Sequence, residues 1–174
     1  MALAVCLLFD AHSELAIRRL WDRLEQEGVP TLRTHTHGRH VPHLSYAVLR
    51  SYDLAKVVDV LDLLPDDGPM VLHFDALGMF RRSRTWLVPA VTSDIAARQE
   101  RVVEALESTG ADLHQHYRPG VWVPHCTLAP RTTLEHLPTI AQTVYDVLPL
   151  VTTADRAALI DTGTGERHPL DHLP

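Results

Sequence analysis

The amino-acid sequence predicts a mixed α/β or α+β fold in which helices cover a sheet. Strand-like apolar runs alternate along the chain with amphipathic helical patterns, which is the order that such folds require. A five-residue motif occurs once in each half, around His43 and, 82 residues later, around His125. No Pro- or Ser-rich linker separates the halves. We therefore expect residues 1–174 to form a single domain built from two pseudo-repeat lobes.

The first half is expected to contain a strand, a helix, two extended segments and a second helix. Ser13 is a candidate N-cap of the first helix, and Gly28 and Pro30 end it. A turn at Gly38 separates the two extended segments. In order, the expected ranges are a strand at 2–9, a helix from 13 to about 27, extended segments at 32–37 and 41–49, and a helix at 53–64.

The second half is expected to begin with a β-hairpin. Its two strands are joined through Gly78 and a polar loop that contains three arginines. The expected ranges are strands at 71–77 and 85–91, a helix capped at 93 or 94 that runs to 106, a strand at 121–128, a helix from about 134 to 147, and a strand around 157–161. Residues 162–174 lack periodicity, so we expect them to form a loop.

The composition fits a folded protein of ordinary size. With 174 residues, of which 45% are hydrophobic and 22% charged, the chain is neither collagen, coiled coil nor a disordered segment. The net charge of −6 argues against a protein that coats duplex DNA. Cys6 and Cys126 are too few for a disulfide framework, which favours the reducing cytoplasm. We expect no signal peptide and no membrane span.

The motif repeats as Val41-Pro42-His43-Leu44-Ser45 and Val123-Pro124-His125-Cys126-Thr127. In a strand, side chains two residues apart share a face, so each histidine lies beside a hydroxyl and the residue between them points the other way. A neutral imidazole beside a hydroxyl, present twice, suits acid–base chemistry on a phosphate. One histidine takes a proton from water, the other protonates the leaving oxygen, and the hydroxyls hold phosphate oxygens.

These residues resemble the two-histidine (2H) phosphoesterase superfamily, which includes the LigT-like 2′-5′ RNA ligases and cyclic nucleotide phosphodiesterases. The family hallmark is a pair of His-x-Thr/Ser-x motifs, which stand here as His43-Leu44-Ser45-Tyr46 and His125-Cys126-Thr127-Leu128. The similarity extends over nearly the whole chain. Ser45 departs from the commoner threonine, and it keeps the hydroxyl but loses the methyl group that limits rotamers.

The resemblance implies an α+β fold with two pseudo-symmetric lobes, antiparallel sheets around a central cleft, and helices on the outside. It also implies metal-free cleavage of 2′,3′-cyclic phosphates on nucleotides or RNA 3′ ends, or of related 2′-5′ linkages, without a cofactor. His43 and His125 are the implied catalytic residues, with His43 as acid and His125 as base, and Ser45 and Thr127 are the implied phosphate-binding residues. We expect a monomer.

Further substrate contacts are less sharply indicated. Arg81, Arg82 and Arg84 form the one compact basic cluster, which can hold flanking phosphates of an RNA end or be a solvated hairpin tip. Phe80 can stack on a base or pack in the core. Arg131 follows the second motif and can reach a phosphate.

Three other interpretations compete with this one. His35, His37, His40 and His43 could form a zinc site, although their spacing matches no ligand pattern that we know. A Cys126–His125 nucleophile pair is opposed by strand alternation, which favours a buried cysteine. A nucleotide- or RNA-end-binding module that lost turnover remains the alternative from a different functional class.

Overall fold

A computed structural model describes residues 2–174, which form an α+β fold. The strands are β1 (Leu3–Phe9), β2 (His43–Ser51), β3 (Met70–Phe80), β4 (Arg84–Pro89), β5 (Asp112–Leu113), β6 (Cys126–Ala129), β7 (Leu150–Asp161) and β8 (Arg167–Leu170). The helices are α1 (Ala11–Gln26), α2 (Leu54–Asp62), α3 (Ser93–Ser108) and α4 (Leu137–Tyr145), with short 3₁₀ helices η1 (Gln115–Tyr117) and η2 (Leu134–His136).

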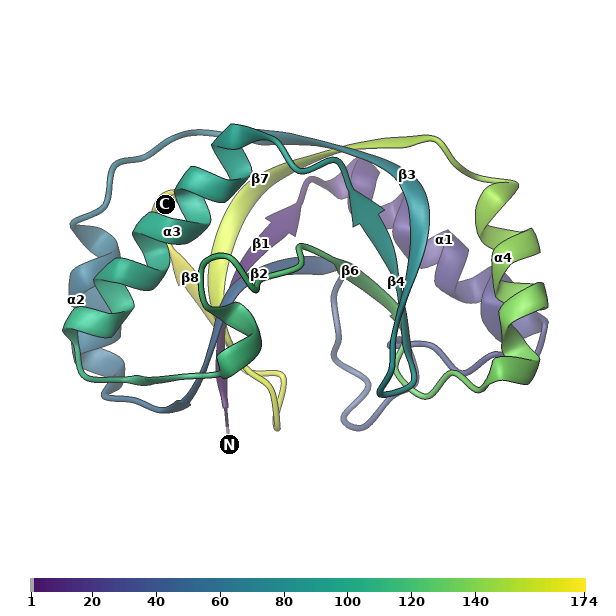
Figure 1. Cartoon of the computed structure of the whole chain (residues 1–174), viewed down its shortest axis with the longest axis horizontal. Coiled ribbons are helices and arrows are strands. Elements are labelled where there is room, and N and C mark those ends of the chain that lie inside the picture. Colours follow the sequence, from purple (N-terminus) through teal and green to yellow (C-terminus); the bar gives the residue numbers. More distant parts are fainter. Residues whose placement is uncertain (1) are drawn as a thin grey trace.

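All eight strands belong to one antiparallel sheet, so the two halves share it. Its order is β5-β2-β1-β7-β3-β4-β6, and β8 pairs with β7. The sheet arches strongly (Figure 1), and β2 contacts β6 even though they lie near opposite ends of the strand order. The curvature thereby brings together the two strands that carry the repeated motif.

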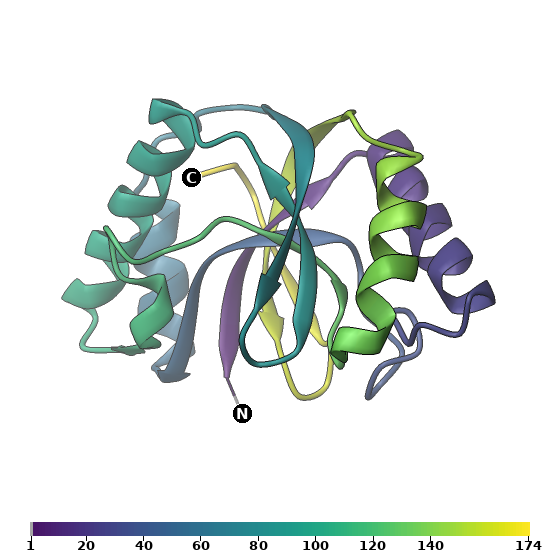
Figure 2. The same ribbon diagram turned by 45° about the vertical axis from the view of Figure 1, so that its right-hand side comes forward.

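The four helices pack against one face of the sheet. They form two pairs, α1 with α4 and α2 with α3, at opposite sides of the arch (Figures 1 and 2). Their apolar residues share a core with Leu3, Val5, Leu7 and Phe9 of β1. The intervening residues of β1 face the other way, where a smaller cluster includes Cys6. This second face carries His43 and Ser45 of the first motif.

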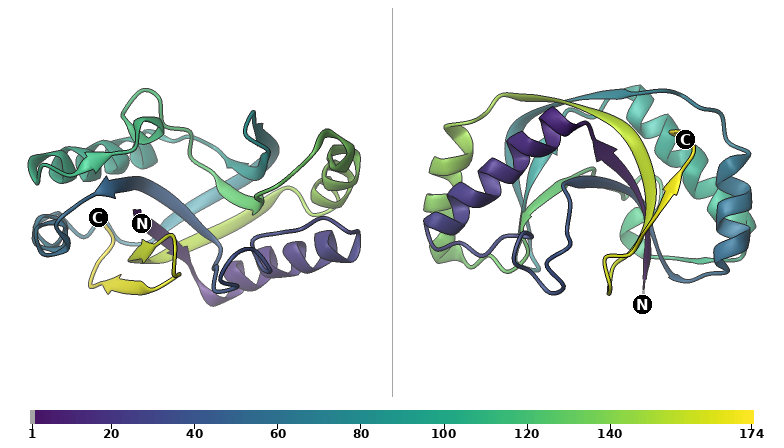
Figure 3. Two further views of the ribbon diagram at one scale, coloured as in Figure 1. Left: turned by 90° about the horizontal axis from the view of Figure 1, so that it is seen from below. Right: turned by 180° about the vertical axis from the view of Figure 1, so that it is seen from behind.

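The structure differs from the sequence expectations in five places. Residues 32–37 form turns rather than a strand, and Thr36 adopts a positive φ of 47° that no strand allows. The strand expected at 121–128 is shortened to β6. Gly78 lies inside β3, which continues to Phe80. The tail forms β8, which lies along β7 in the view from behind (Figure 3), and β5 is an additional short strand.

The helix caps also differ from the expected ones. The Asp10 carboxylate accepts a hydrogen bond from the Ser13 backbone N–H at 2.7 Å, so Asp10 caps α1 and Ser13 lies inside it. Thr92 caps α3 in the same way by accepting from Ile95. Each cap contributes about 1 kcal/mol to helix stability. No helix within residues 2–174 is both long and apolar enough to cross a membrane.

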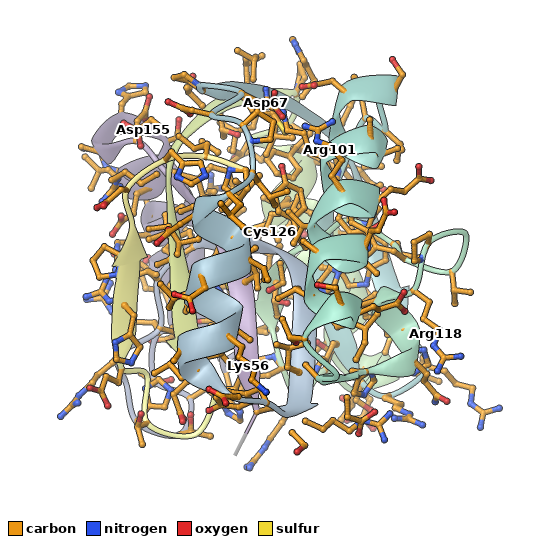
Figure 4. All side chains as sticks on the ribbon, turned by 90° about the vertical axis from the view of Figure 1, so that its left-hand side faces the viewer. Lys56, Asp67, Arg101, Arg118, Cys126 and Asp155 are labelled. Atoms are coloured by element: carbon orange, nitrogen blue, oxygen red, sulfur yellow. The ribbon has the colours of Figure 1, made fainter. Side chains whose placement is uncertain are left out.

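A buried arginine fixes α3 against the segment that follows α2. The Arg98 guanidinium donates to the Gly68 carbonyl at 2.8 Å and to the Asp67 carbonyl at 3.0 Å. Arg101, one turn further along α3, forms an ion pair with the Asp67 carboxylate (Figure 4). These contacts hold in place the helix that supplies Gln99 to the motif strand.

Candidate active site

The two motif histidines are held in the same way. In each, Nδ1 donates a hydrogen bond of 2.7 Å to the carbonyl two residues earlier, Val41 for His43 and Val123 for His125. Because a carbonyl only accepts, the Nδ1 proton is fixed and the neutral ring presents an unprotonated Nε2. No group within residues 2–174 forms a hydrogen bond with either Nε2. Both nitrogens are therefore free to exchange protons with a substrate.

The register of β2 places His43 and Ser45 on the helix-free face. His43 lies opposite Leu8, and Ser45 lies opposite Cys6. Leu44 and Tyr46 are fully buried in the core under the helices. The expected alternation of the first motif is confirmed.

The register of β6 gives the second motif the same alternation. Thr127 lies opposite Trp86 of β4, whereas Cys126 and Leu128 are fully buried in the core. Burial raises the pKa of the Cys126 thiol to about 12. This thiol stays protonated at neutral pH, and the expectation of a buried cysteine is confirmed.

The two motifs lie next to each other. The backbone N–H of Leu32 donates to the Leu128 carbonyl at 3.0 Å, and the backbone of His43 lies close enough to Cys126 to affect the pKa of its thiol. The charge of His43 lowers the pKa of His125, so the two imidazoles act on each other electrostatically. The two motif histidines therefore lie within electrostatic range of each other.

Two side chains that the sequence analysis did not assign to the site support the backbone of the first motif. The indole Nε1 of Trp122 donates to the Ser45 carbonyl at 3.0 Å. The buried amide of Gln99 donates to the carbonyls of Tyr46 at 3.2 Å and Tyr117 at 2.7 Å. Tyr46 is the extra residue of a β-bulge, since Val5 pairs with Ala47 and the next residue of β1 pairs with Ser45. Such bulges re-aim neighbouring side chains.

The Ser45 hydroxyl belongs to a small polar cluster. It lies 3.4 Å from the Cys6 sulfur and lowers the pKa of the nearby Tyr117 hydroxyl. Burial raises the pKa of Tyr117 to about 12, so this phenol remains a neutral donor. Only 7% of Ser45 is exposed. Because so little of Ser45 is exposed, a ligand can contact its hydroxyl only over a small area. The Tyr117 hydroxyl is an additional donor close to it.

His125 packs against two aromatic rings. The ring of Phe80 lies 5.0 Å away and that of Trp86 5.7 Å away, and the two rings stack on each other at 4.8 Å. Burial lowers the pKa of His125 to about 4, with smaller contributions from the charges of His43 and Arg84. Phe80 thus contacts a motif histidine, and this role fits neither the base-stacking nor the core-packing interpretation alone.

His43 is partly buried, and within residues 2–174 no aromatic ring packs against it as Phe80 and Trp86 do against His125. Burial lowers its pKa below the usual 6.5, and the hydrogen bond to Val41 opposes that effect. Both rings are therefore neutral in the free protein at pH 7. A bound phosphate supplies the negative charge that stabilises a proton on one of them.

The four arginines named in the sequence analysis lie in three different places. Arg84 lies opposite Phe80 at the end of the hairpin, and its charge lowers the pKa of His125. Arg81 and Arg82 lie in the exposed turn, and Arg82 acts electrostatically on His114 instead. Arg131 acts on His35. The structure thus brings Arg84 to the motif residues and leaves Arg81 and Arg82 at the rim.

The histidines of the loop before β2 lie close together but do not form a metal site. The His37 and His40 rings are 4.1 Å apart, and those of His35 and His40 are 5.8 Å apart. Within residues 2–174, no three His, Cys, Asp or Glu side chains are arranged to hold a metal ion. The zinc interpretation therefore lacks the ligand geometry that it needs.

Sequence comparison decides the family. The model of the 2′-5′ RNA ligase superfamily matches residues 10–166. The chain belongs to this superfamily. A comparison with curated proteins found no match.

Solved structures of other proteins share the fold. Escherichia coli LigT complexed with 3′-AMP superposes with a TM-score of 0.60 and 16% identity, over 97% of this chain and 94% of LigT. Kluyveromyces marxianus Usb1 with uridine monophosphate gives 0.53 and 10%, over 97% of each chain. The MHV ns2 PDE domain gives 0.51 and 21%, over 74% of this chain and 82% of the domain. The expected α+β fold is confirmed.

Proposed function

We propose that this superfamily member is a metal-independent phosphoesterase that acts on 2′,3′-cyclic phosphates of nucleotides or RNA 3′ ends, or on related 2′-5′ linkages. The observation that carries the proposal is the matched anchoring of His43 and His125, each through Nδ1 to a carbonyl at 2.7 Å. Two imidazoles with free Nε2 atoms, beside two hydroxyls, form the minimal set for acid–base chemistry on one phosphate. The proposal treats residues 1–174 as one domain with two pseudo-repeat lobes.

Hydrolysis of a cyclic phosphate then needs two proton transfers. Nε2 of one neutral histidine takes a proton from water as the water oxygen bonds to phosphorus. The bond from phosphorus to one ribose oxygen breaks, and the second histidine, protonated at Nε2, donates its proton to that oxygen. The product is a phosphomonoester with a free neighbouring hydroxyl. The two histidines exchange protonation states, and solvent restores them.

We assign the base role to His125 and the acid role to His43. The aromatic enclosure and the lowered pKa of about 4 favour a neutral His125 above that pH. Each histidine carries the same backbone hydrogen bond, which raises its pKa against the effect of burial, so the aromatic rings around His125 are what distinguishes the two sites. Because the motifs are related by pseudo-symmetry, a substrate bound in the opposite sense exchanges the roles.

The remaining polar groups stabilise the phosphate. Ser45 and Thr127 share the face of their respective histidines and can donate to nonbridging oxygens. Arg84 adds a fixed positive charge close to His125. In this arrangement the charge that develops on the phosphoryl oxygens meets preorganised donors rather than water.

Incubation with 2′,3′-cyclic nucleotides and 2′-5′ dinucleotides in the presence of a chelator tests the proposal. We expect a phosphomonoester product whose rate of formation does not change with the chelator. Binding of these compounds without any product would favour the non-catalytic nucleotide- or RNA-end-binding module. Loss of activity on chelation, restored by zinc, would favour a metal-dependent hydrolase.

We also propose a cellular location and an oligomeric state for the protein. Both cysteines are free and buried, which agrees with a reducing cytoplasm. We expect the protein to act as a monomer on small or single-stranded substrates.

A further inference from the structure

The loop between α1 and β2 is held beside the catalytic residues. It begins at a backbone hydrogen bond from Leu32 to Leu128 of the second motif and ends at His43. The β7–β8 turn packs against its outer side, where a Cβ on Gly165 would lie 2.5 Å from the His37 ring. In Figure 1 this loop, the β3–β4 turn and the β7–β8 turn lie along the same lower edge. The loop is therefore part of the surroundings of the site.

Hydrogen bonds within the loop fix its shape. The Gly38 N–H donates to the His35 carbonyl at 3.0 Å, and the Thr36 hydroxyl lies 3.0 Å from His40 Nε2. The Arg39 N–H donates to His37 Nδ1 at 3.0 Å. These bonds set three imidazoles side by side, those of His35, His37 and His40, which we call the loop-histidine cluster.

The charged groups that act on this cluster are basic. His35 is affected by Arg131, from the segment after β6, and by Arg84 of β4. His40 is affected by His43 of β2 and by its two neighbours in the cluster. Burial and this mutual repulsion lower the pKa of His40 to about 4. The cluster is thus a group of protonatable side chains, and the charges that act on His35 and His40 are basic.

Three carboxylates of α1 and the β7–β8 turn are engaged elsewhere. Glu25 accepts hydrogen bonds from the hydroxyls of Thr31 at 2.7 Å and Thr34 at 2.8 Å. Asp22 forms an ion pair with Arg33. In the β7–β8 turn, the Asp161 carboxylate accepts from the backbone N–H groups of that turn. None of these contacts brings negative charge to the loop-histidine cluster.

One donor of the cluster lacks a partner. His37 Nδ1 accepts from Arg39, so the proton of the neutral ring is on Nε2. Within residues 2–174 this buried Nε2 forms no hydrogen bond. A buried donor without an acceptor destabilises the folded state, and an anion that enters the cluster can supply the acceptor.

We propose that the loop-histidine cluster, together with Arg84 and Arg131, binds a second phosphate of the substrate next to the one that reacts. This inference rests on the proposed function for the position of the reacting phosphate. The second phosphate is either a terminal phosphomonoester of the same nucleotide or the adjoining phosphodiester of an RNA chain. Binding of the dianionic monoester protonates the neutral imidazoles of His35 and His40, so it strengthens as the pH falls.

Calorimetry with nonreacting probes tests the subsite. We expect adenosine 3′,5′-bisphosphate to bind at least about tenfold more tightly than adenosine 3′-monophosphate at pH 6, the scale of one charge-assisted hydrogen bond. The advantage should shrink at pH 8, and binding should take up protons from the buffer. A dinucleotide with an internal phosphodiester and a terminal 3′-phosphate replaces the bisphosphate in a second arm. An advantage in that arm alone assigns the subsite to the RNA backbone.

Variants localise the effect. His40→Asn and Arg131→Gln should each reduce the ratio of the two affinities, whereas His73→Asn, an exposed histidine on β3, should leave it unchanged. Equal affinities for both probes in the wild-type protein at pH 6 and pH 8, in both arms, would overturn the proposal, and so would a ratio retained in both variants. If His40→Asn does not fold, the pH dependence of the affinity ratio in the wild-type protein and the ratio in Arg131→Gln still test the proposal.

The outcomes separate this inference from the proposed function. A preference for the second phosphate in a protein that cleaves no cyclic phosphate would refute the catalytic proposal and retain the subsite. Cleavage of cyclic nucleotides by a protein that shows no preference for the second phosphate would support the catalytic proposal and refute the subsite.

Discussion

Replacing Gly78 by alanine should disturb the aromatic support of His125. A Cβ at this position would lie 2.4 Å from Cζ2 of the Trp86 indole, while carbon atoms in contact are normally about 3.5–4.0 Å apart. The indole must therefore move by about 1 Å or more. Overpacking of this kind costs roughly 1–3 kcal/mol of folding stability.

The displacement should also affect catalysis, because Trp86 stacks on Phe80 and both rings contact His125. A misplacement of about 1 Å in a catalytic group can lower the rate on the order of 10²-fold. We expect kcat/KM for a 2′,3′-cyclic nucleotide to fall by about 10- to 10²-fold. The pKa of His125, followed by NMR, should rise toward its ordinary value as the rings move away and water enters.

Two controls separate this effect from general destabilisation. Gly110→Ala places a Cβ in open space at a φ of +77°, which costs about 1–3 kcal/mol far from the motifs and should leave kcat/KM unchanged. Trp86→Phe combined with Gly78→Ala removes the overlapping ring and should recover much of the lost stability. A folded Gly78→Ala protein with wild-type kcat/KM and an unchanged His125 pKa would refute the role of Trp86 in holding this histidine.

Three further predictions concern the chemistry. The base must be neutral and the acid protonated, and burial lowers the pKa of both histidines below 6.5, so the plot of kcat/KM against pH should be bell-shaped with its maximum below about pH 6.5; a maximum above pH 8 would contradict the assignment. Ser45→Ala and Thr127→Val should each lower kcat/KM by the equivalent of roughly 1.5–3 kcal/mol, less than loss of either histidine, as steady-state kinetics can measure. His43→Ala should retain more activity on a 4-nitrophenyl phosphodiester, whose leaving group needs no protonation, than His125→Ala does; the opposite pattern would exchange acid and base.

The alternation within the motifs could be predicted from the sequence because it depends only on the two-residue period of a strand. That rule placed Leu44 and Cys126 in the core and the histidines on the other face, and burial agrees. The same rule could not predict which residues surround the motifs. Gln99 binds the Tyr46 carbonyl from 53 positions away, and nothing in its local sequence distinguishes it from a surface glutamine.

Local patterns failed where tertiary contacts decide the backbone. Gly78 resembles a turn residue, yet it lies inside β3 because the Trp86 indole occupies the space of a side chain. Residues 32–37 are compatible with a strand, but the bond from Gly38 to His35 and the positive φ of Thr36 produce turns. A strand as short as β8 carries too few residues for its pairing with β7 to be visible in the sequence.

The central claim is that His43 and His125 act as one catalytic unit on a single phosphate. Single-turnover cleavage of a 2′,3′-cyclic nucleotide by His43→Ala, His125→Ala and the double variant tests it directly, with circular dichroism to establish that each variant is folded. We predict that either substitution abolishes most of the activity and that the double variant is little slower than the single ones, because residues that act together are strongly nonadditive. Full activity in either folded single variant would contradict the claim.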